Sequence, residues 1–148
     1  MTLLTHRGEG PSFPYAGQPM HILAGRDGQP PGFAAMEITI PPLFAGPVPH
    51  AHDVFDEALY VLSGHLLVAG DGAPQEAAPG SMFVAPRGQR HGFSNPSAEP
   101  ALVLGIWAPP EPALAFMRDI GAALMPDVPP DPDQMRDIYA RHASRLLP

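Results

Sequence analysis

Proline and glycine interrupt this chain at short intervals, which restricts it to short elements of regular structure. The 148 residues include 22 prolines and 15 glycines, and both residue types weaken the interior of helices and strands. Such a content approaches that of disordered chains. However, 45% of the residues are hydrophobic, and disordered chains are poor in apolar residues. We therefore expect one folded domain made of many short strands joined by turns.

Alternating apolar residues mark several of these strands. In residues 34–40, Met36, Ile38 and Ile40 share one face, as in a half-buried strand. Further strands are expected at residues 47–52, 59–62, 66–69, 75–78, 81–85, 91–94 and 101–108. Residues 70–72 read Gly-Asp-Gly, and this sequence predicts a hairpin because Asp-Gly favours tight turns.

The two ends of the chain differ from this strand region. Residues 1–32 show little periodicity, so we expect an irregular arm with a possible edge strand at residues 20–24. From residue 113 to residue 124, apolar side chains recur with the period of an amphipathic helix. A second helix should begin at Asp131, a good N-cap that precedes a proline. The expected apolar face of this helix consists of Met135, Ile138, Tyr139 and Leu146.

Residue types that are absent exclude several kinds of chemistry. The chain has no cysteine, so it has neither disulfides nor thiolate ligands. All eight basic residues are arginine, which excludes a lysine Schiff base. The formal net charge of −7 argues against a nucleic-acid surface, and no apolar stretch approaches the roughly 20 residues of a membrane span. We expect a soluble, cytoplasmic protein with no nucleic-acid or membrane partner.

Four side chains have the spacing of a metal site. His50 and His52 are two residues apart, so both point to the same side of a strand. Glu57 has the wrong parity for the same strand; residues 53–56 should therefore turn, so that Glu57 opens the next strand beside the first. Together with His91 these residues suit one divalent transition metal, such as Mn, Fe, Co, Ni, Cu or Zn. In an octahedral metal, two positions stay open for water, dioxygen or a chelating substrate.

At these residues the chain resembles the cupin superfamily, which carries two sequence motifs. Five residues fit the first motif: Gly46, His50, His52, Glu57 and Gly64. The spacer before the first histidine has three residues where five are usual. Five more residues match the second motif in full: Gly80, Pro86, Gly88, His91 and Asn95. The stretch between the motifs, residues 65–79, has the short length typical of single-domain bacterial cupins.

The resemblance implies a mainly β fold, a double-stranded β-helix (jelly-roll) barrel. The barrel would occupy residues 33–109, after the arm of residues 1–32, and residues 110–148 would form a helical extension of the same domain. The resemblance also implies metal ligation by His50, His52, Glu57 and His91. We further expect a homodimer that acts on a small-molecule substrate.

A weaker resemblance extends to small cupins of the quercetin-dioxygenase-like type. It covers residues 47–63, residues 86–88 and the two C-terminal helices. In that family the metal binds a flavonol, the glutamate takes up the hydroxyl proton of the substrate, and dioxygen opens the ring. By analogy, Glu57 would be both a ligand and the catalytic base.

The substrate pocket is harder to predict. Apolar residues near the motifs are candidates for its lining, although barrel core is the simpler interpretation for any single one: Met36, Ile38, Leu59, Val61, Phe93 and Trp107. Arg87 and Arg90 are the cations near the motifs, which is few for a sugar-phosphate enzyme. We therefore expect a metal-dependent dioxygenase that acts on an aromatic or enol-type chelating substrate. A non-catalytic small-molecule-binding cupin and a cupin isomerase or decarboxylase are the alternatives.

Overall fold

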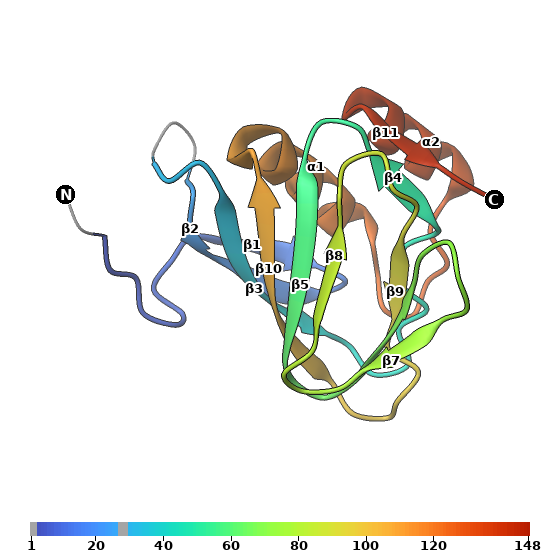
Figure 1. The fold of residues 1–148 in the computed structure, drawn as a ribbon, viewed down its shortest axis with the longest axis horizontal. Helices are drawn as coiled ribbons and strands as arrows, with labels where there is room; N and C mark the ends of the chain where they lie inside the picture. The colour runs from blue at the N-terminus through green and yellow to red at the C-terminus, as the bar shows by residue number, and fades with distance from the viewer. Residues whose placement is uncertain (1–2, 27–29) are drawn as a thin grey trace.

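The fold is a jelly-roll barrel with two helices packed against it (Figure 1). The computed structural model describes residues 3–26 and 30–148. Its strands are β1 (Ser12–Tyr15), β2 (Gln18–Ala24), β3 (Ala34–Ile40), β4 (His50–His52), β5 (Asp56–Ser63), β6 (Leu66–Ala69), β7 (Gln75–Ala77), β8 (Met82–Ala85), β9 (Gly92–Ser94), β10 (Ala101–Ala108) and β11 (Ser144–Leu146). The helices are α1 (Pro110–Ala123) and α2 (Pro132–Arg141).

The strands form one large and two small sheets. The large sheet has the order β1-β2-β3-β10-β5-β8, and the small sheets have the orders β7-β6-β9 and β11-β4. β10 lies between β3 and β5, and its residues are alternately buried and partly buried. Both faces of this apolar strand are therefore at least partly covered. The predicted bounds of β3 and β10 are confirmed, and so is the hairpin of β6 and β7.

The N-terminal arm is more regular than the sequence suggests. β1 and β2 form an antiparallel hairpin whose turn residues, Ala16 and Gly17, both have positive φ. β2 also pairs with β3, so it is an interior strand and β1 forms the edge of the sheet. A strand does cover residues 20–24, but it is an interior strand and not an edge strand, and residues 12–24 form a hairpin where an irregular arm was expected. Residues 1–2 and 27–29 of this arm lie outside the described residues. Pro14 and Pro19 face each other across the hairpin, and prolines hide a strand pattern because they are usually confined to edges.

The C-terminus also departs from the prediction. α2 begins as expected, since the Asp131 side chain accepts a hydrogen bond from the backbone N of Asp133 (2.9 Å). The helix ends at Arg141, and Ala143 has a φ of 49°. The chain then forms β11, which pairs antiparallel with β4, and Leu146 lies opposite His50. Leu146 therefore belongs to a strand and not to the helix, because the backbone of β4 offers it hydrogen-bonding partners.

The helix α1 covers the barrel next to the N-terminal hairpin. It buries Leu114, Phe116, Met117 and Ile120. Gly121 allows the close contact with β1, because a Cβ atom at this residue would lie 2.2 Å from the carbonyl oxygen of Pro14. In the described part of the chain, no helix is long and apolar enough to cross a membrane.

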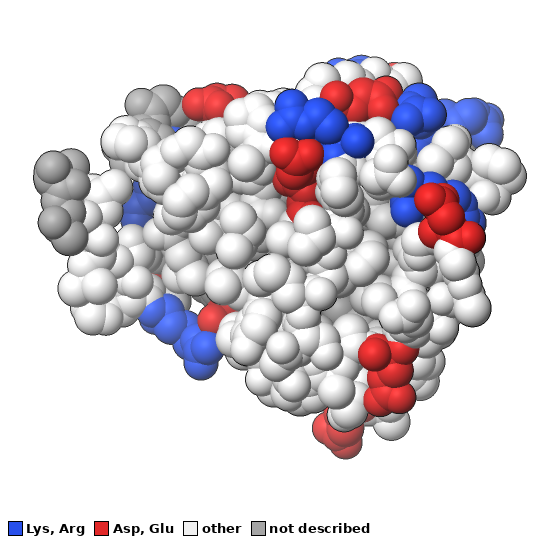
Figure 2. Space-filling model, viewed as in Figure 1, with Lys and Arg blue, Asp and Glu red and all other residues white. Residues whose placement is uncertain are grey.

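On the face drawn in Figure 2, charged side chains lie mostly toward the edge of the view. Figure 2 shows acidic and basic groups side by side near the edge of the view, with an uncharged area over β5 and β8. Two rim pairs are bidentate: Arg87 with Asp56 and Arg145 with Asp53. These pairs are exposed to solvent, so they contribute little to stability.

Candidate metal centre

The barrel brings three histidines to one point. His50 and His52 lie on β4, and His91 is bridged to His50 by two backbone hydrogen bonds of 2.9 and 2.8 Å. All three side chains are buried, and their ligand nitrogen atoms lie within 4.8 Å of one another. The prediction that alternate residues of one strand face the same site agrees with this geometry.

Hydrogen bonds at Nδ1 set the orientation of each imidazole. Nδ1 of His50 bonds to the carbonyl oxygen of Val48 (2.8 Å), and Nδ1 of His91 bonds to that of Gln89 (3.0 Å). A carbonyl oxygen only accepts, so in both residues Nδ1 carries a proton and Nε2 is the ring nitrogen left for coordination. This is the tautomer that coordinates a metal through Nε2.

Ser144 does the same for the third imidazole. Nδ1 of His52 lies 2.7 Å from the Oγ of Ser144, and this hydroxyl donates to the carbonyl oxygen of His142 (3.3 Å). The hydroxyl proton is thus used, and Oγ accepts from Nδ1–H. The ring of Phe55 stacks on the imidazole of His52, with the two ring centroids 4.2 Å apart. Neither Ser144 nor Phe55 was predicted from the sequence. For Ser144 no local signal exists, because it lies 92 residues from His52.

The chemistry of these donor atoms fits a metal ion. The Nε2 atoms of His52 and His91 are buried and have no hydrogen-bond partner among the described residues. Buried polar atoms rarely lack a partner, and a divalent cation would supply one. Burial, with the neighbouring imidazoles as a smaller cause, lowers the pKa of His50 to about 3 and that of His52 to about 2. Both are neutral at pH 7, as metal ligands must be.

Glu57 faces the three histidines from the opposite sheet. Its Oε2 lies 3.7 Å from Nε2 of His52, and its Oε1 lies 3.7 Å from Nε2 of His91. These distances are too long for hydrogen bonds, so the carboxylate borders the same space without bonding to the imidazoles. Trp107 donates a 2.8 Å hydrogen bond from Nε1 to Oε2 of Glu57.

The expected position of Glu57 needs one correction. The turn after β4 does lead to Glu57, which is near the start of β5. However, β5 pairs with β10 and β8, and the strand beside β4 is β11. Glu57 therefore reaches the histidines across the interior of the barrel and not from a neighbouring strand.

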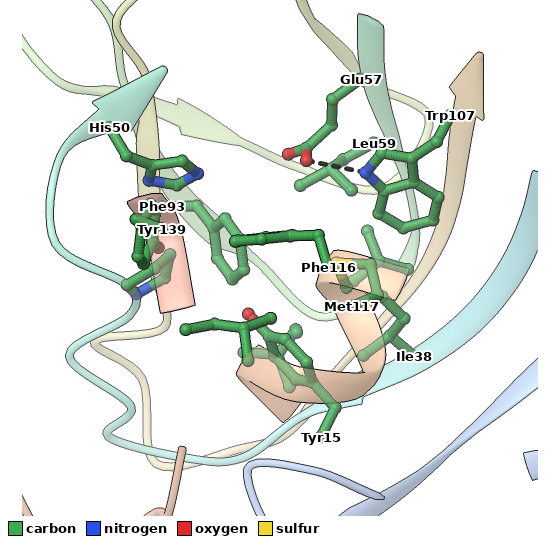
Figure 3. A pocket seen from close by; sticks show the side chains of 14 residues that line it. Tyr15, Ile38, His50, Glu57, Leu59, Phe93, Trp107, Phe116, Met117 and Tyr139 are labelled. Atoms are coloured by element: carbon green, nitrogen blue, oxygen red, sulfur yellow. Dashed lines mark hydrogen bonds between the residues drawn. The ribbon is translucent and has the colours of Figure 1, made fainter. Parts of the chain in front are cut away.

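A small apolar cavity adjoins this centre (Figure 3). Its volume is about 20 Å³, which is room for roughly one water molecule. The side chains that line it are Tyr15, Ile38, Ile40, Pro47, His50, Glu57, Leu59, Phe93, Val103, Trp107, Phe116, Met117, Ile120 and Tyr139. In Figure 3, His50 and Glu57 lie at one end of the cavity and Tyr15 lies at the other.

Four of the six predicted pocket residues line this cavity: Ile38, Leu59, Phe93 and Trp107. Met36 and Val61 do not; they are buried in the core. Met36 pairs with Gly105, and the indole of Trp107 lies over Gly105, where a Cβ atom would be only 2.0 Å from the ring. The indole thus covers the part of the sheet to which Met36 belongs.

The lining residues that the sequence analysis missed come largely from the two ends of the chain. Tyr15 lies on β1, Phe116, Met117 and Ile120 lie on α1, and Tyr139 lies on α2. The helical period identified the apolar faces of both helices but not the surface that they cover. Burial, and to a smaller extent the charge of Glu57, raises the pKa of both tyrosines.

The two arginines near the motifs face away from the cavity. Arg87 binds Asp56 through its backbone and side chain, and its hydrogen bonds lower the pKa of Asp56 to about 2. Arg90 donates to the carbonyl oxygens of Gly70 (2.7 Å) and Pro148 (3.2 Å). No arginine is found among the described residues that line the cavity.

In a comparison with known protein families, residues 36–107 match the family model described as the cupin domain. KdgF from Halomonas sp. is 26% identical with a TM-score of 0.55, over 65% of this chain and 82% of that chain. TT1209 from Thermus thermophilus is 27% identical with a TM-score of 0.52, and the match covers 73% of this chain and 91% of that chain. The polyketide cyclase RemF from Streptomyces resistomycificus has a TM-score of 0.60 over 73% and 80%. Its identity is 23%, so it supports the fold alone. No curated protein sequence matches the chain.

Proposed function

Because the chain contains a cupin domain with three convergent, buried histidines, we propose that it is a metal-dependent dioxygenase of the quercetinase-like type. Its substrate is an aromatic or enol-type compound that chelates the metal. The observation that carries this proposal is the pairing of a buried three-imidazole centre with an apolar cavity that adjoins it directly.

The ligands proposed for the metal are His50, His52, His91 and Glu57. A divalent transition metal held there would bind the oxygen atoms of a chelating substrate and activate it toward dioxygen. The imidazoles would supply lone pairs, and the carboxylate would offset part of the cationic charge. The metal is one of Mn, Fe, Co, Ni, Cu or Zn.

Glu57 is the proposed base. Its Oε2 accepts the hydrogen bond from Trp107, which keeps the carboxylate oriented toward the histidines. Its Oε1 accepts no hydrogen bond from the described residues, so it is available to take the proton of a substrate hydroxyl. The apolar side chains around it exclude water from the deprotonated substrate.

The lining favours this substrate class over a sugar phosphate. A phosphate would require cationic or several polar donors, whereas Arg87 and Arg90 are engaged elsewhere on the surface. The isomerase or decarboxylase alternative is therefore less well supported. A non-catalytic cupin that binds the same ligands has the same geometry, and the activity test distinguishes it.

The reaction is balanced without an external reductant. Both oxygen atoms of dioxygen enter the organic product, and the electrons come from the substrate. The test is dioxygen consumption by protein loaded in turn with each candidate metal, with flavonols and catechol-like enols as substrates, and with ¹⁸O₂ to label the product. Binding of these compounds without dioxygen consumption in any metal form would identify a binding protein instead. The matched control is His91→Ala, which should lose metal and activity together.

Two further properties are predictions of the sequence. A homodimer would have twice the chain mass of 15.7 kDa, which light scattering measures directly. The second predicted property is a cytoplasmic location, with no nucleic-acid or membrane partner.

A further inference from the structure

The hydroxyl group of Tyr139 is buried and lacks a hydrogen-bond partner among the described residues. Tyr139 is only 1% exposed, and it lines the cavity that adjoins the metal centre. Its ring packs edge-on against His50 and Phe116, with centroid distances of 5.2 Å to each. A phenylalanine would make the same ring contacts, so the hydroxyl is not needed for packing.

Tyr15 is a second phenol on the same cavity. It comes from β1, on the opposite end of the chain, and is 3% exposed. Figure 3 shows its side chain entering the cavity from the end away from Glu57. Both tyrosines lie outside residues 36–107, the part that matches the cupin domain. The chain thus adds two phenols to the barrel from its own N- and C-terminal elements.

A buried hydroxyl without a partner is costly, since it gives up its hydrogen bonds to water. Such groups are rare in folded proteins, and one on the wall of a cavity beside a metal centre is well placed to bond with a ligand. A phenol is protonated at neutral pH, so it donates to an oxygen acceptor and can also accept.

We propose that Tyr139, assisted by Tyr15, binds an oxygen atom of the substrate that is remote from the metal-bound oxygens. The ligand class is an aromatic compound with a chelating enol–carbonyl pair and at least one further oxygen on another part of its skeleton. Tyr139 is then a specificity-determining residue. This inference rests on the proposed function in one respect, that a metal-chelating ligand enters this cavity.

The ligand must displace side chains to enter. The cavity has a volume of about 20 Å³, whereas an apolar cavity that holds benzene is closer to about 150 Å³. Phe116 and Met117, both on α1, lie between the metal centre and Tyr15 (Figure 3). Met117 is unbranched and adapts easily to a new shape, so these side chains are expected to move when a ring binds.

The test compares two flavonols on the zinc-loaded protein, since zinc performs no redox chemistry. Both share the 3-hydroxy-4-keto chelating unit, and only one carries a hydroxyl on the remote ring. Binding is followed by the absorbance change of the flavonol. Wild type should bind the hydroxylated compound about tenfold more tightly, the effect of one neutral hydrogen bond. Tyr139→Phe should lose this preference and keep its affinity for the other flavonol.

Two measurements separate this role from a structural one. The melting temperature of Tyr139→Phe should equal or exceed that of wild type, because the hydroxyl has no hydrogen-bond partner among the described residues. Tyr15→Phe should reduce the preference, whereas Tyr60→Phe, which does not line the cavity, should retain it.

Three results would overturn the proposal: an unchanged preference in the Tyr15→Phe/Tyr139→Phe double variant, a melting temperature lowered by several degrees in Tyr139→Phe, or no binding of either flavonol to wild type. Failure of the dioxygenase proposal looks different. In that case, no metal form consumes dioxygen, yet the zinc form still discriminates between the two flavonols through Tyr139.

Discussion

Removal of the Ser144 hydroxyl should weaken metal binding although Ser144 does not face the metal. Its Oγ accepts the Nδ1–H of His52 at 2.7 Å and is held by its own bond to the carbonyl oxygen of His142. In Ser144→Ala, Nδ1–H of a histidine that is 1% exposed loses its acceptor. The imidazole is then free to turn or to adopt the other tautomer, which would place a proton on the ligand nitrogen.

The expected magnitude follows from the same contact. A buried donor left without an acceptor costs about 1–3 kcal/mol. Loss of a hydrogen bond to a metal-bound histidine typically lowers metal affinity by about 10- to 100-fold, which corresponds to about 1.4–2.7 kcal/mol. The two ranges overlap, so we expect a loss of affinity of at least tenfold.

The assay is a competition titration in which a chromophoric chelator competes for Zn²⁺ or Ni²⁺ with the metal-free protein. Ser144→Thr retains the hydroxyl and should stay within a few-fold of wild type. Ser63→Ala, an exposed serine at the end of β5, controls for the loss of a hydroxyl as such. If Ser144→Ala bound metal within twofold of wild type while His52→Ala lost it, Ser144 would have no part in orienting His52.

Three further predictions concern the same centre. Glu57→Gln should abolish dioxygen consumption yet weaken metal binding less than His52→Ala does; turnover at the wild-type rate would refute the assignment of Glu57 as the base. Trp107→Phe should lower the turnover rate and destabilise the protein by about 1–3 kcal/mol in denaturant unfolding, because Oε2 of Glu57 loses its 2.8 Å donor; unchanged turnover would mean that this bond does not orient the carboxylate. The metal-free protein should lose stability as the pH falls below about 6.5, the ordinary pKa of histidine. Because the folded-state pKa values of His50 and His52 lie near 3 and 2, the unfolded chain binds protons first and stability is complete only above that pH. Thermal melts between pH 8 and pH 5 test this, and a constant melting temperature would contradict it.

Local patterns in the sequence were sufficient for much of the barrel. β3 follows from apolar alternation and β10 from a continuous apolar stretch, and the predicted bounds of both agree with the structure. The convergence of His50 and His52 follows from strand parity, which depends only on neighbours along the chain. The Asp131 cap is equally local, since its hydrogen bond spans two residues.

The ends of the chain were less predictable. β2 has Pro19 in its first residues, and β11 is only three residues long. The strand expected at residues 20–24 lies within β2, but its pairing on both sides was not predicted, and no periodicity marks β11 as a strand. Each exists because a neighbouring strand, β3 or β4, presents unpaired backbone groups to it, and a local pattern does not record that neighbour.

By itself, then, the sequence determined the main strands of the barrel, the jelly-roll fold class and the histidines that meet at one point. Only the tertiary structure decided what surrounds them. It placed Glu57 on the opposite sheet, Ser144 behind His52, and Tyr15 and Tyr139 on one cavity. The physical reason is that parity and capping act over a few residues, whereas these contacts join distant segments; His52 and Ser144, for example, are 92 residues apart. They arise when the N-terminal hairpin and the C-terminal helices pack against the barrel.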